Sequence, residues 1–260
     1  MGHQAKKRFG QNFLVDELVI ADIIRAIQPE ATNNVLEIGP GLGALTRPLI
    51  EHLNTLHVVE IDRDIIARLK SDYPQHKIII HEGDALKFDL TELVIPLRIV
   101  GNLPYNISSP LLFHFAKSAA HITDMHFMLQ NEVVERMVAA PSTPEYGRLS
   151  VMLQYRFHLE KLLDVPPEAF RPAPKVHSAI VRMIPVPKNE IQVQDEKLFA
   201  DIVLAAFGQR RKTLRNTLRG ILSENDFAHL AIDPGLRAEN LSHLEYARIS
   251  NLVKARQTPK

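Results

Sequence analysis

The sequence predicts an α/β fold, a Rossmann-like, doubly wound parallel sheet followed by a small all-α C-terminal domain. Between residues 35 and 130, short apolar runs alternate with stretches of helical periodicity, as in consecutive βαβ units. The runs are short and apolar throughout, which is typical of strands buried on both faces. Beyond residue 187 the apolar residues recur at helical spacing, which predicts helices.

Composition narrows the class of protein. The chain has 260 residues, enough for a real core in one large domain or two. Its formal net charge is +1, so affinity for nucleic acid must come from local clusters of charge. It has no cysteine, which excludes disulfides and thiolate metal sites and fits a reducing compartment. With neither a signal-peptide region nor a membrane-spanning apolar run, we expect a cytoplasmic protein.

The chain begins with a basic and aromatic arm, residues 1–15, that has no clear periodicity. Asp16 is a predicted N-cap, because apolar residues at helical spacing follow it as far as Ile27 and Pro29 then stops the pattern. The alternating region then predicts five strands, at 35–38, 56–61, 77–81, 99–101 and 124–129. Helices are predicted between and after them, at 44–53, 64–72 and 109–118 and from about residue 131.

The pattern changes after residue 144. Residues 149–155 fit either a helix or a strand, 157–165 alternate imperfectly, and 179–184 form a further predicted strand. Residues 185–190 contain two prolines and a polar end, which indicates a linker. We therefore expect a catalytic domain at 1–186 and a helical domain at 187–260.

The tetrapeptide Asn102-Leu103-Pro104-Tyr105 directly follows a predicted buried strand, where open α/β sheets place their ligands. The Asn102 amide oxygen and the Leu103 carbonyl can accept the two hydrogens of an exocyclic amine. Pro104 fixes the turn, and Tyr105 can stack on a flat base. The alternative is a polar turn that caps the strand, with Tyr105 packed in the core.

Three acidic residues lie at the ends of three successive strands. Glu37 opens an ExGxGxG turn that includes Gly39 and Gly41, where glycines allow a ligand to approach the backbone. This spacing differs from the GxGxxG of dinucleotide folds, and the acid suits a cationic cofactor. Glu60 is placed to accept ribose hydroxyls, and Asp84 to accept from an adenine amine. Taken singly, each is equally a solvated carboxylate at a strand end.

Four motifs resemble, in this order, the ribosomal RNA adenine dimethyltransferase family and its small-subunit members: RFGQNFL (8–14), EIGPGLG (37–43), GNLPY (101–105) and FRPAPKV (170–176). The resemblance implies a methyltransferase fold that binds S-adenosylmethionine. It places Asn12 and Leu14 over the cofactor, with Gly39 beneath its methionine part. It also gives Glu60 the ribose, Asp84 the adenine and Asn102 the sulfonium end.

The resemblance also implies a mechanism and a substrate. Two acceptors on the adenine amine would favour its pyramidal form and concentrate charge on nitrogen, and no general base is needed before attack. Tyr105 would stack on one face of the base and Phe170 on the other; the alternative for Phe170 is a loop anchor packed on the core. The family's substrate is a pair of adjacent adenosines in the 3′-terminal hairpin of small-subunit (16S) rRNA.

Basic residues cluster in several places, as expected for phosphate contacts; the ordinary alternative is a solvated helix face. A base must leave its stack to enter a pocket, so the substrate should be a loop or a loosened helix end. The candidate RNA-binding residues are Lys7, Arg8, Arg171, Lys175, Arg210, Arg211, Lys212 and Arg215.

The histidines lack HxxxH and HExxH spacing, so we expect no metal. The partners implied by the resemblance are small-subunit rRNA and the small ribosomal subunit or its precursor, bound by a monomer. Three other functions remain open: a large-subunit dimethyltransferase of the antibiotic-resistance type, a non-catalytic ribosome-assembly factor, and a nicotinamide dehydrogenase.

Overall fold

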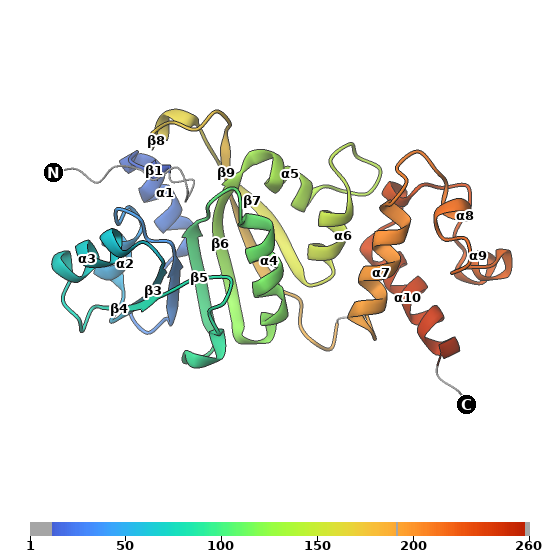
Figure 1. Cartoon of the computed structure of the whole chain (residues 1–260), viewed down its shortest axis with the longest axis horizontal. Helices are drawn as coiled ribbons and strands as arrows, with labels where there is room; N and C mark the ends of the chain where they lie inside the picture. Colours follow the sequence, from blue (N-terminus) through green and yellow to red (C-terminus); the bar gives the residue numbers. More distant parts are fainter. Residues whose placement is uncertain (1–11, 191, 258–260) are drawn as a thin grey trace. The chain divides into compact units, whose positions relative to one another are not determined.

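The computed structural model describes residues 12–190 and 192–257 (Figure 1). Its contacts divide the chain into two compact units. The first unit comprises Met1–Val134 and Leu159–Pro185, and the second comprises Glu135–His158 and Val186–Lys260.

A seven-stranded sheet forms the centre of the fold, and its strand order is β4-β3-β2-β5-β6-β9-β7. Neighbouring strands from β4 to β6 pair in parallel, and β9 pairs antiparallel to β6. This arrangement confirms the predicted Rossmann-like α/β class. The strands are β2 (Val35–Ile38), β3 (Leu56–Glu60), β4 (Ile78–Glu82), β5 (Leu97–Asn102), β6 (Ile122–Gln130), β7 (Phe157–Val165) and β9 (Ser178–Pro185).

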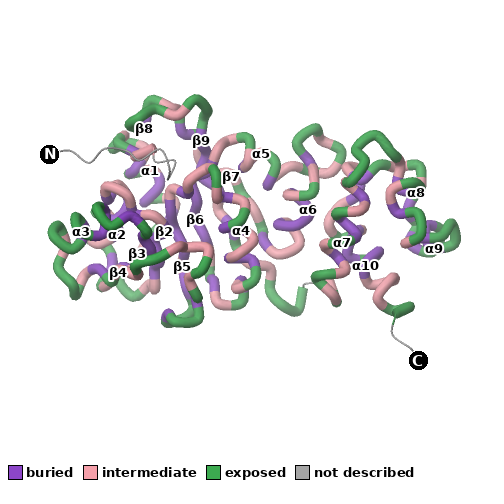
Figure 2. Tube along the Cα trace, viewed as in Figure 1, coloured by how far each residue is buried: buried purple, intermediate pink, exposed green. Residues whose placement is uncertain are grey.

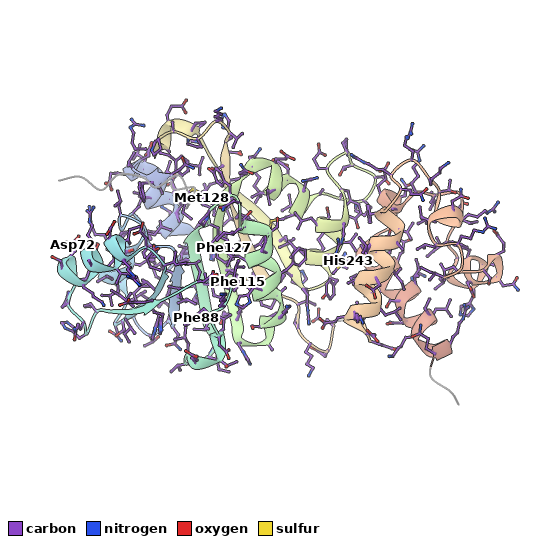
Figure 3. The ribbon with its side chains drawn as sticks, viewed as in Figure 1. Asp72, Phe88, Phe115, Phe127, Met128 and His243 are labelled. Atoms are coloured by element: carbon purple, nitrogen blue, oxygen red, sulfur yellow. The ribbon has the colours of Figure 1, made fainter. Side chains whose placement is uncertain are left out.

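The parallel strands β2, β3, β5 and β6 are largely buried, in keeping with their apolar sequences, whereas the edge strand β4 has one buried residue (Figure 2). All four residues of β2 are buried, and so are four of the five in β3. Phe115 of α4 stacks on Phe127 of β6 with ring centroids 5.6 Å apart (Figure 3). The helices of the alternating region are α1 (Glu17–Ile27), α2 (Thr46–His52), α3 (Arg63–Asp72), α4 (Ser108–Lys117) and α5 (Asn131–Val138).

The N-cap predicted at Asp16 is confirmed. Its Oδ1 accepts hydrogen bonds from the backbone N–H groups of Leu18 (2.9 Å) and Val19 (3.2 Å), which have no partner within the helix. The helix ends at Gln28, whose φ of 50° places it in the left-handed region directly before Pro29.

One small sheet was not expected from the sequence. Strand β1 (Phe13–Leu14) pairs antiparallel with β8 (Phe170–Arg171), so that Leu14 lies opposite Phe170. Strands of two residues have no periodicity to detect, and this pair depends on contact between distant parts of the chain. The pairing fixes the position of residues 13 and 14, near the end of the arm.

The second unit is helical in its described part: α6 (Arg148–Gln154), α7 (Glu196–Phe207), α8 (Leu214–Thr217), α9 (Glu224–Leu230) and α10 (His243–Gln257). The ambiguous stretch at 149–155 is therefore mostly helix. Helix α6 packs against α7 and α10, and Arg156, just after it, forms an ion pair with Glu196 of α7. These contacts explain why residues 135–158 group with the C-terminal helices. The sequence had predicted a single domain boundary at residue 186.

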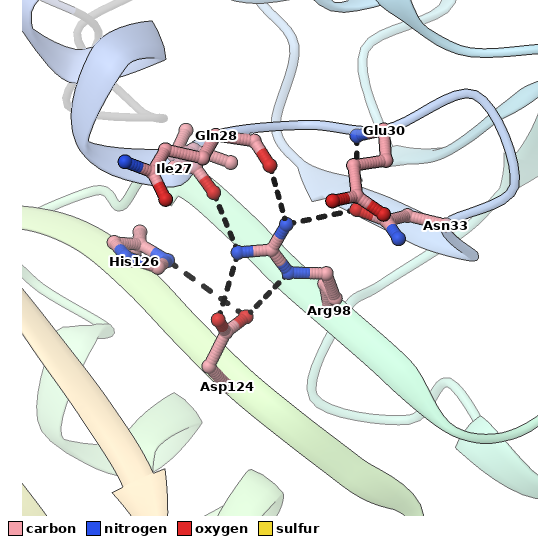
Figure 4. A network of polar contacts seen from close by, with 7 residues as sticks. All are labelled: Ile27, Gln28, Glu30, Asn33, Arg98, Asp124 and His126. Carbon is pink, nitrogen blue, oxygen red and sulfur yellow. Dashed lines mark hydrogen bonds and ion pairs between the residues drawn. The ribbon is translucent and has the colours of Figure 1, made fainter.

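A buried ionic network lies at the amino ends of β5 and β6 (Figure 4). The guanidinium of Arg98 donates from Nε and Nη2 to the two carboxylate oxygens of Asp124, at 2.9 and 2.8 Å. It also donates to the carbonyls of Ile27 (2.6 Å) and Gln28 (3.1 Å) and to Oδ1 of Asn33 (2.9 Å). The network thus joins the end of α1 to two strands of the sheet.

Candidate active site

A cavity of about 320 Å³ lies at the carboxyl ends of β2, β3, β4 and β5, within the first unit. Parallel strands bring these ends to one edge, which is where such folds bind ligands. Every residue predicted to contact the cofactor lines this cavity, and so does the whole tetrapeptide: Asn12, Leu14, Glu37, Gly39, Gly41, Glu60, Asp84 and residues 102–105.

The turn after β2 depends on glycine. Gly39 and Gly41 have φ values of +65° and +55°, a region that residues with a Cβ rarely adopt. A Cβ on Gly41 would also lie 3.2 Å from the ring of Phe13. The turn that lines the cavity at this point therefore requires glycine.

Glu37 is a buried carboxylate at the end of β2. The hydroxyl of Thr46, in the first turn of α2, donates to its Oε2 at 2.7 Å. Burial raises the pKa of Glu37 to about 7, and the charge of Glu60 adds to this, while the Thr46 hydrogen bond opposes it. A cationic group in the cavity would find here a carboxyl that loses its proton readily near neutral pH.

Glu60 ends β3 on the adjacent side of the cavity. Its Oε1 accepts the backbone N–H groups of Ile61 and Asp62, each at 2.8 Å. Burial raises its pKa, and these backbone hydrogen bonds oppose the shift. They also fix the orientation of the carboxylate, which lines the cavity.

Asp84 follows β4 and has a similar arrangement, with Oδ1 accepting the N–H of Leu86 at 3.0 Å. The N–H of Gly83 donates to the carbonyl of Glu60 at 2.9 Å, which joins the two loops. The three acidic residues that the sequence singled out therefore line one cavity rather than standing apart as solvated strand ends.

The tetrapeptide is held by its neighbours in the sheet. A Cβ on Gly101 would lie 2.6 Å from the carbonyl oxygen of Ile38 in β2, so only glycine fits at this position. The N–H of Leu103 donates to the carbonyl of Met128 in β6 at 3.1 Å. Pro104 restricts the backbone of the turn, and its carbonyl accepts from the N–H of Ile107 at 3.1 Å.

The side chain of Asn102 is oriented by a residue of the N-terminal arm. Its Nδ2 donates to the backbone carbonyl of Asn12 at 3.0 Å. This hydrogen bond orients the amide, in which Oδ1 is the atom that can accept a hydrogen from a ligand. No local pattern in the sequence predicts this contact, which joins residues 90 positions apart.

Tyr105 lines the cavity with its ring, and its hydroxyl is held on the other side. Its Oη lies 2.7 Å from Oγ of Ser178, the first residue of β9. Burial raises the pKa of Tyr105, so the phenol is neutral at physiological pH. The ring is thus at the cavity wall, rather than packed wholly in the core.

Phe170 does not line the cavity, contrary to the stacking role expected for it. Its side chain is fully buried in the core cluster that also contains Leu14, its β-sheet partner. The alternative interpretation, a loop anchor packed on the core, describes this placement. The physical reason is the β1–β8 pairing, which turns Phe170 inward.

The candidate RNA-binding residues lie in both units. In the first, Arg171 and Lys175 are exposed, and Arg171 donates to the carbonyls of Glu168 (3.1 Å) and Phe170 (2.8 Å). Lys7 and Arg8 lie outside the described residues. In the second unit all four candidates are exposed: Arg210, Arg211, Lys212 and Arg215.

One further cation joins the second group. Thr213 forms an isolated antiparallel bridge with Arg237, which brings that exposed arginine next to the 210–215 segment. Arg215 itself pairs with Glu224, with Nε and Oε1 2.9 Å apart. Arg237 was missed because the bridge spans two loops that are distant in sequence.

Two features are absent from the described part of the chain. Over 12–190 and 192–257, three or more histidine, aspartate or glutamate side chains never gather in a way suited to a metal ion. Within the same ranges, no helix combines the length and the apolar character needed to cross a membrane.

The chain is similar over nearly its whole length to known proteins. Residues 2–255 match the family model described as ribosomal RNA adenine dimethylase. A "Ribosomal RNA small subunit methyltransferase A" from Aromatoleum aromaticum is 63% identical over 98% of this chain and 96% of that protein. One of the same name from Thiobacillus denitrificans is 61% identical over 98% of this chain and 100% of that protein.

Solved structures share the fold. A dimethyladenosine transferase from Plasmodium falciparum superposes with a TM-score of 0.81 at 23% identity, covering 94% of this chain and 98% of that one. The 23S rRNA methyltransferase ErmE superposes with a TM-score of 0.74 at 25% identity, covering 94% and 100%. Both comparisons extend over nearly the whole length of each chain.

Proposed function

The chain belongs to the ribosomal RNA adenine dimethylase family, and on this premise we propose that it dimethylates two adjacent adenosines in the 3′-terminal hairpin of small-subunit (16S) rRNA. The methyl groups come from S-adenosylmethionine. The observation that carries the proposal is full-length identity of about 60% to several small-subunit methyltransferases. The large-subunit enzyme ErmE, by contrast, is 25% identical.

The residues that line the cavity have the chemistry needed to bind S-adenosylmethionine. The cavity's carboxylates would hold the cationic groups and hydroxyls of that cofactor, and its glycine turn would leave room for the methionine part. When bound, the cofactor supplies a methyl group on a positively charged sulfur. We propose that Asn12, Leu14, Glu37, Gly39, Gly41, Glu60, Asp84 and Asn102 hold it.

The tetrapeptide would bind the adenine. Asn102 Oδ1 and the Leu103 carbonyl would each accept one hydrogen of the exocyclic amine, whose lone pair is otherwise delocalised into the ring. Two fixed acceptors favour the pyramidal amine and meet the positive charge that develops as it attacks. The hydrogen bond from Asn102 Nδ2 to the Asn12 carbonyl supports this assignment, because it orients the amide whose Oδ1 would accept.

Tyr105 would stack on the base, and base–aromatic stacking contributes about 1–3 kcal/mol. Holding the amine in line with the methyl group supplies the proximity contribution. The methylated product is acidic enough to lose its proton to water, so the mechanism assigns no side chain as general base. Phe170 has no part in this proposal, because it packs in the core.

We expect cofactor affinity to depend on pH through Glu37. The cofactor is cationic and favours the carboxylate, so binding lowers the pKa of about 7 that Glu37 has without it and releases a proton. Affinity should therefore rise as pH increases through about 6 to 7 and level off above. Calorimetry in two buffers of different ionisation enthalpy measures the released proton. Glu37→Gln should abolish both effects, and exposed Glu51→Gln should keep them; a pH-independent affinity in the wild type would contradict this role.

We further propose that residues 1–186 carry the chemistry and that 187–260 contribute binding to RNA or to the ribosome. Replacing both Arg211 and Lys212 with alanine should weaken RNA binding and reduce the slope of log K against log salt by about 1.4, since single-stranded contacts contribute about 0.7 each. The measurement is a salt titration of binding to a small-subunit rRNA hairpin. Exposed Lys197→Ala is the control, and an unchanged slope in the double variant would exclude these contacts.

The function is tested by transfer of labelled methyl groups. The acceptors are undermethylated small subunits, undermethylated large-subunit RNA and free small-subunit RNA. We expect dimethyladenosine only in small-subunit material. Label in large-subunit RNA would support the resistance-type function, and tight binding to the small subunit without label would indicate an assembly factor.

We also propose that the enzyme is a cytoplasmic monomer. Gel filtration coupled to light scattering tests the monomeric state.

A further inference from the structure

Tyr105 is anchored at the end of its side chain that points away from the base site. Its Oη is 2.7 Å from Oγ of Ser178, and Ser178 is fully buried at the start of β9. Strand β9 is in turn fixed in register with β6, where Ser178 lies opposite Gln130. The anchor for Tyr105 is therefore a rigid part of the central sheet.

From this geometry we infer that Ser178 is a positioning residue for methyl transfer, which acts by holding the ring of Tyr105 in the direction that places it beside the target adenine. This inference rests on the proposed function. The backbone at Tyr105 is held independently, because its carbonyl accepts from Ser108 Oγ at 3.2 Å and the turn closes from Ile107 to Pro104. With the Cα end and the Oη end both fixed, the direction of the ring is determined.

The hydrogen bond constrains one motion and leaves another free. Oη lies on the axis about which a tyrosine ring flips, so the bond fixes where the ring points but not its rotation about that axis. A ring without the bond can swing its hydroxyl toward water, away from the stacking position. A ring that has swung away no longer lies beside the base, so this swing lowers the population that can stack on it.

The position of Ser178 in the chain extends this role. It follows directly after the exposed loop that contains Arg171 and Lys175, two of the candidate RNA-binding residues. The N–H of Asn131 donates to the carbonyl of His177 at 2.9 Å, which fixes the end of that loop on the sheet. Ser178 thus lies where the proposed RNA loop, β9 and the tyrosine meet.

The test is a double-mutant cycle in which the two single variants are expected to lose different amounts of activity. Ser178→Ala leaves a phenol hydroxyl that must turn to water, so we expect kcat/KM for RNA to fall about tenfold. Tyr105→Phe leaves an apolar ring that has no hydroxyl to hydrate, so we expect kcat/KM to fall only about two- to threefold. The double variant should match Tyr105→Phe alone, which means that the second change rescues the first.

Two controls separate positioning from folding. Ser250 of α10 is another fully buried serine, whose hydroxyl has no hydrogen-bond partner among the described residues; Ser250→Ala should keep wild-type kcat/KM. Cofactor affinity should be unchanged in Ser178→Ala. A double variant whose loss is the product of the single losses would overturn the inference, and so would an equal loss in Ser250→Ala.

A second readout does not depend on activity. With 3-fluorotyrosine incorporated, the ¹⁹F resonance of residue 105 is assigned as the one missing in Tyr105→Phe. Ser178→Ala should shift and broaden this resonance, while Ser250→Ala leaves it in place. An unchanged resonance would overturn the inference even if the enzyme is active. Absence of methyl transfer in the wild type, with the shift observed, would instead count against the proposed function alone.

Discussion

Replacing Asn102 with alanine is expected to reduce methyl transfer by about 10²- to 10³-fold, the cost of removing one preorganised polar group that faces charge developing in a transition state. Cofactor affinity should fall much less, because Glu37, Glu60 and Asp84 still line the cavity. The measurement pairs single-turnover transfer of labelled methyl groups with calorimetric cofactor titration. Exposed Asn54→Ala is the control for loss of an amide.

Asn102→Asp separates two roles of the Asn102 amide: its oxygen as an acceptor, and its Nδ2 as the group that orients the side chain. Aspartate keeps an acceptor oxygen but replaces the Nδ2 donor that now binds the Asn12 carbonyl at 3.0 Å, and two acceptors facing each other repel. We therefore expect this variant to lose most of its transfer as well. Wild-type turnover in Asn102→Ala would disprove the mechanism, and wild-type turnover in Asn102→Asp would disprove the orienting role of Asn12.

Arg98→Met is expected to reduce the free energy of unfolding by about 3–5 kcal/mol, because it leaves the buried carboxylate of Asp124 without its cation. The side chains of Arg98 and Asp124 are only 14% and 15% exposed, so water replaces the lost contacts poorly. The variant also leaves the carbonyls of Ile27 and Gln28 without this donor. Urea titration followed by circular dichroism measures the change.

The matched control is Arg68→Met, which breaks an ion pair with Asp72 in α3. Those side chains are 44% and 46% exposed, and exposed pairs at this spacing contribute about 0.3–0.5 kcal/mol. Equal losses in the two arginine variants would contradict the importance assigned to burial. Methyl transfer by the folded fraction of Arg98→Met should remain, because Arg98 lies at the opposite ends of the strands from the cavity.

Most of the sheet could be predicted because its information is local. The strand expected at 35–38 has those bounds in the structure, and the helix after Asp16 starts and ends within a residue of its cap and proline signals. Because the carboxyl ends of parallel strands lie at one edge of the sheet, acidic residues at those ends are expected to lie close together. This is why Glu37, Glu60 and Asp84 were found together from the sequence.

What the sequence could not reveal depends on contacts between distant segments. The strands β1 and β8 have two residues each and exist only as a pair. The bonds from Asn102 to Asn12 and from Tyr105 to Ser178 join separate loops, and neither has a periodic pattern. The inward turn of Phe170 follows from the same pairing, so its burial could not be read from the prolines around it.

The pairing of Leu14 with Phe170 also has a consequence for how the protein is made. A nascent chain emerges from its N-terminus, so residues 12–14 leave the ribosome long before the strand that holds them has been synthesised. The entropic cost of closing such a long loop is met only once the sheet between them is in place. We therefore expect the cofactor cavity to be completed late, after translation has passed β8, so that a nascent chain ending before β8 should not bind the methyl donor tightly.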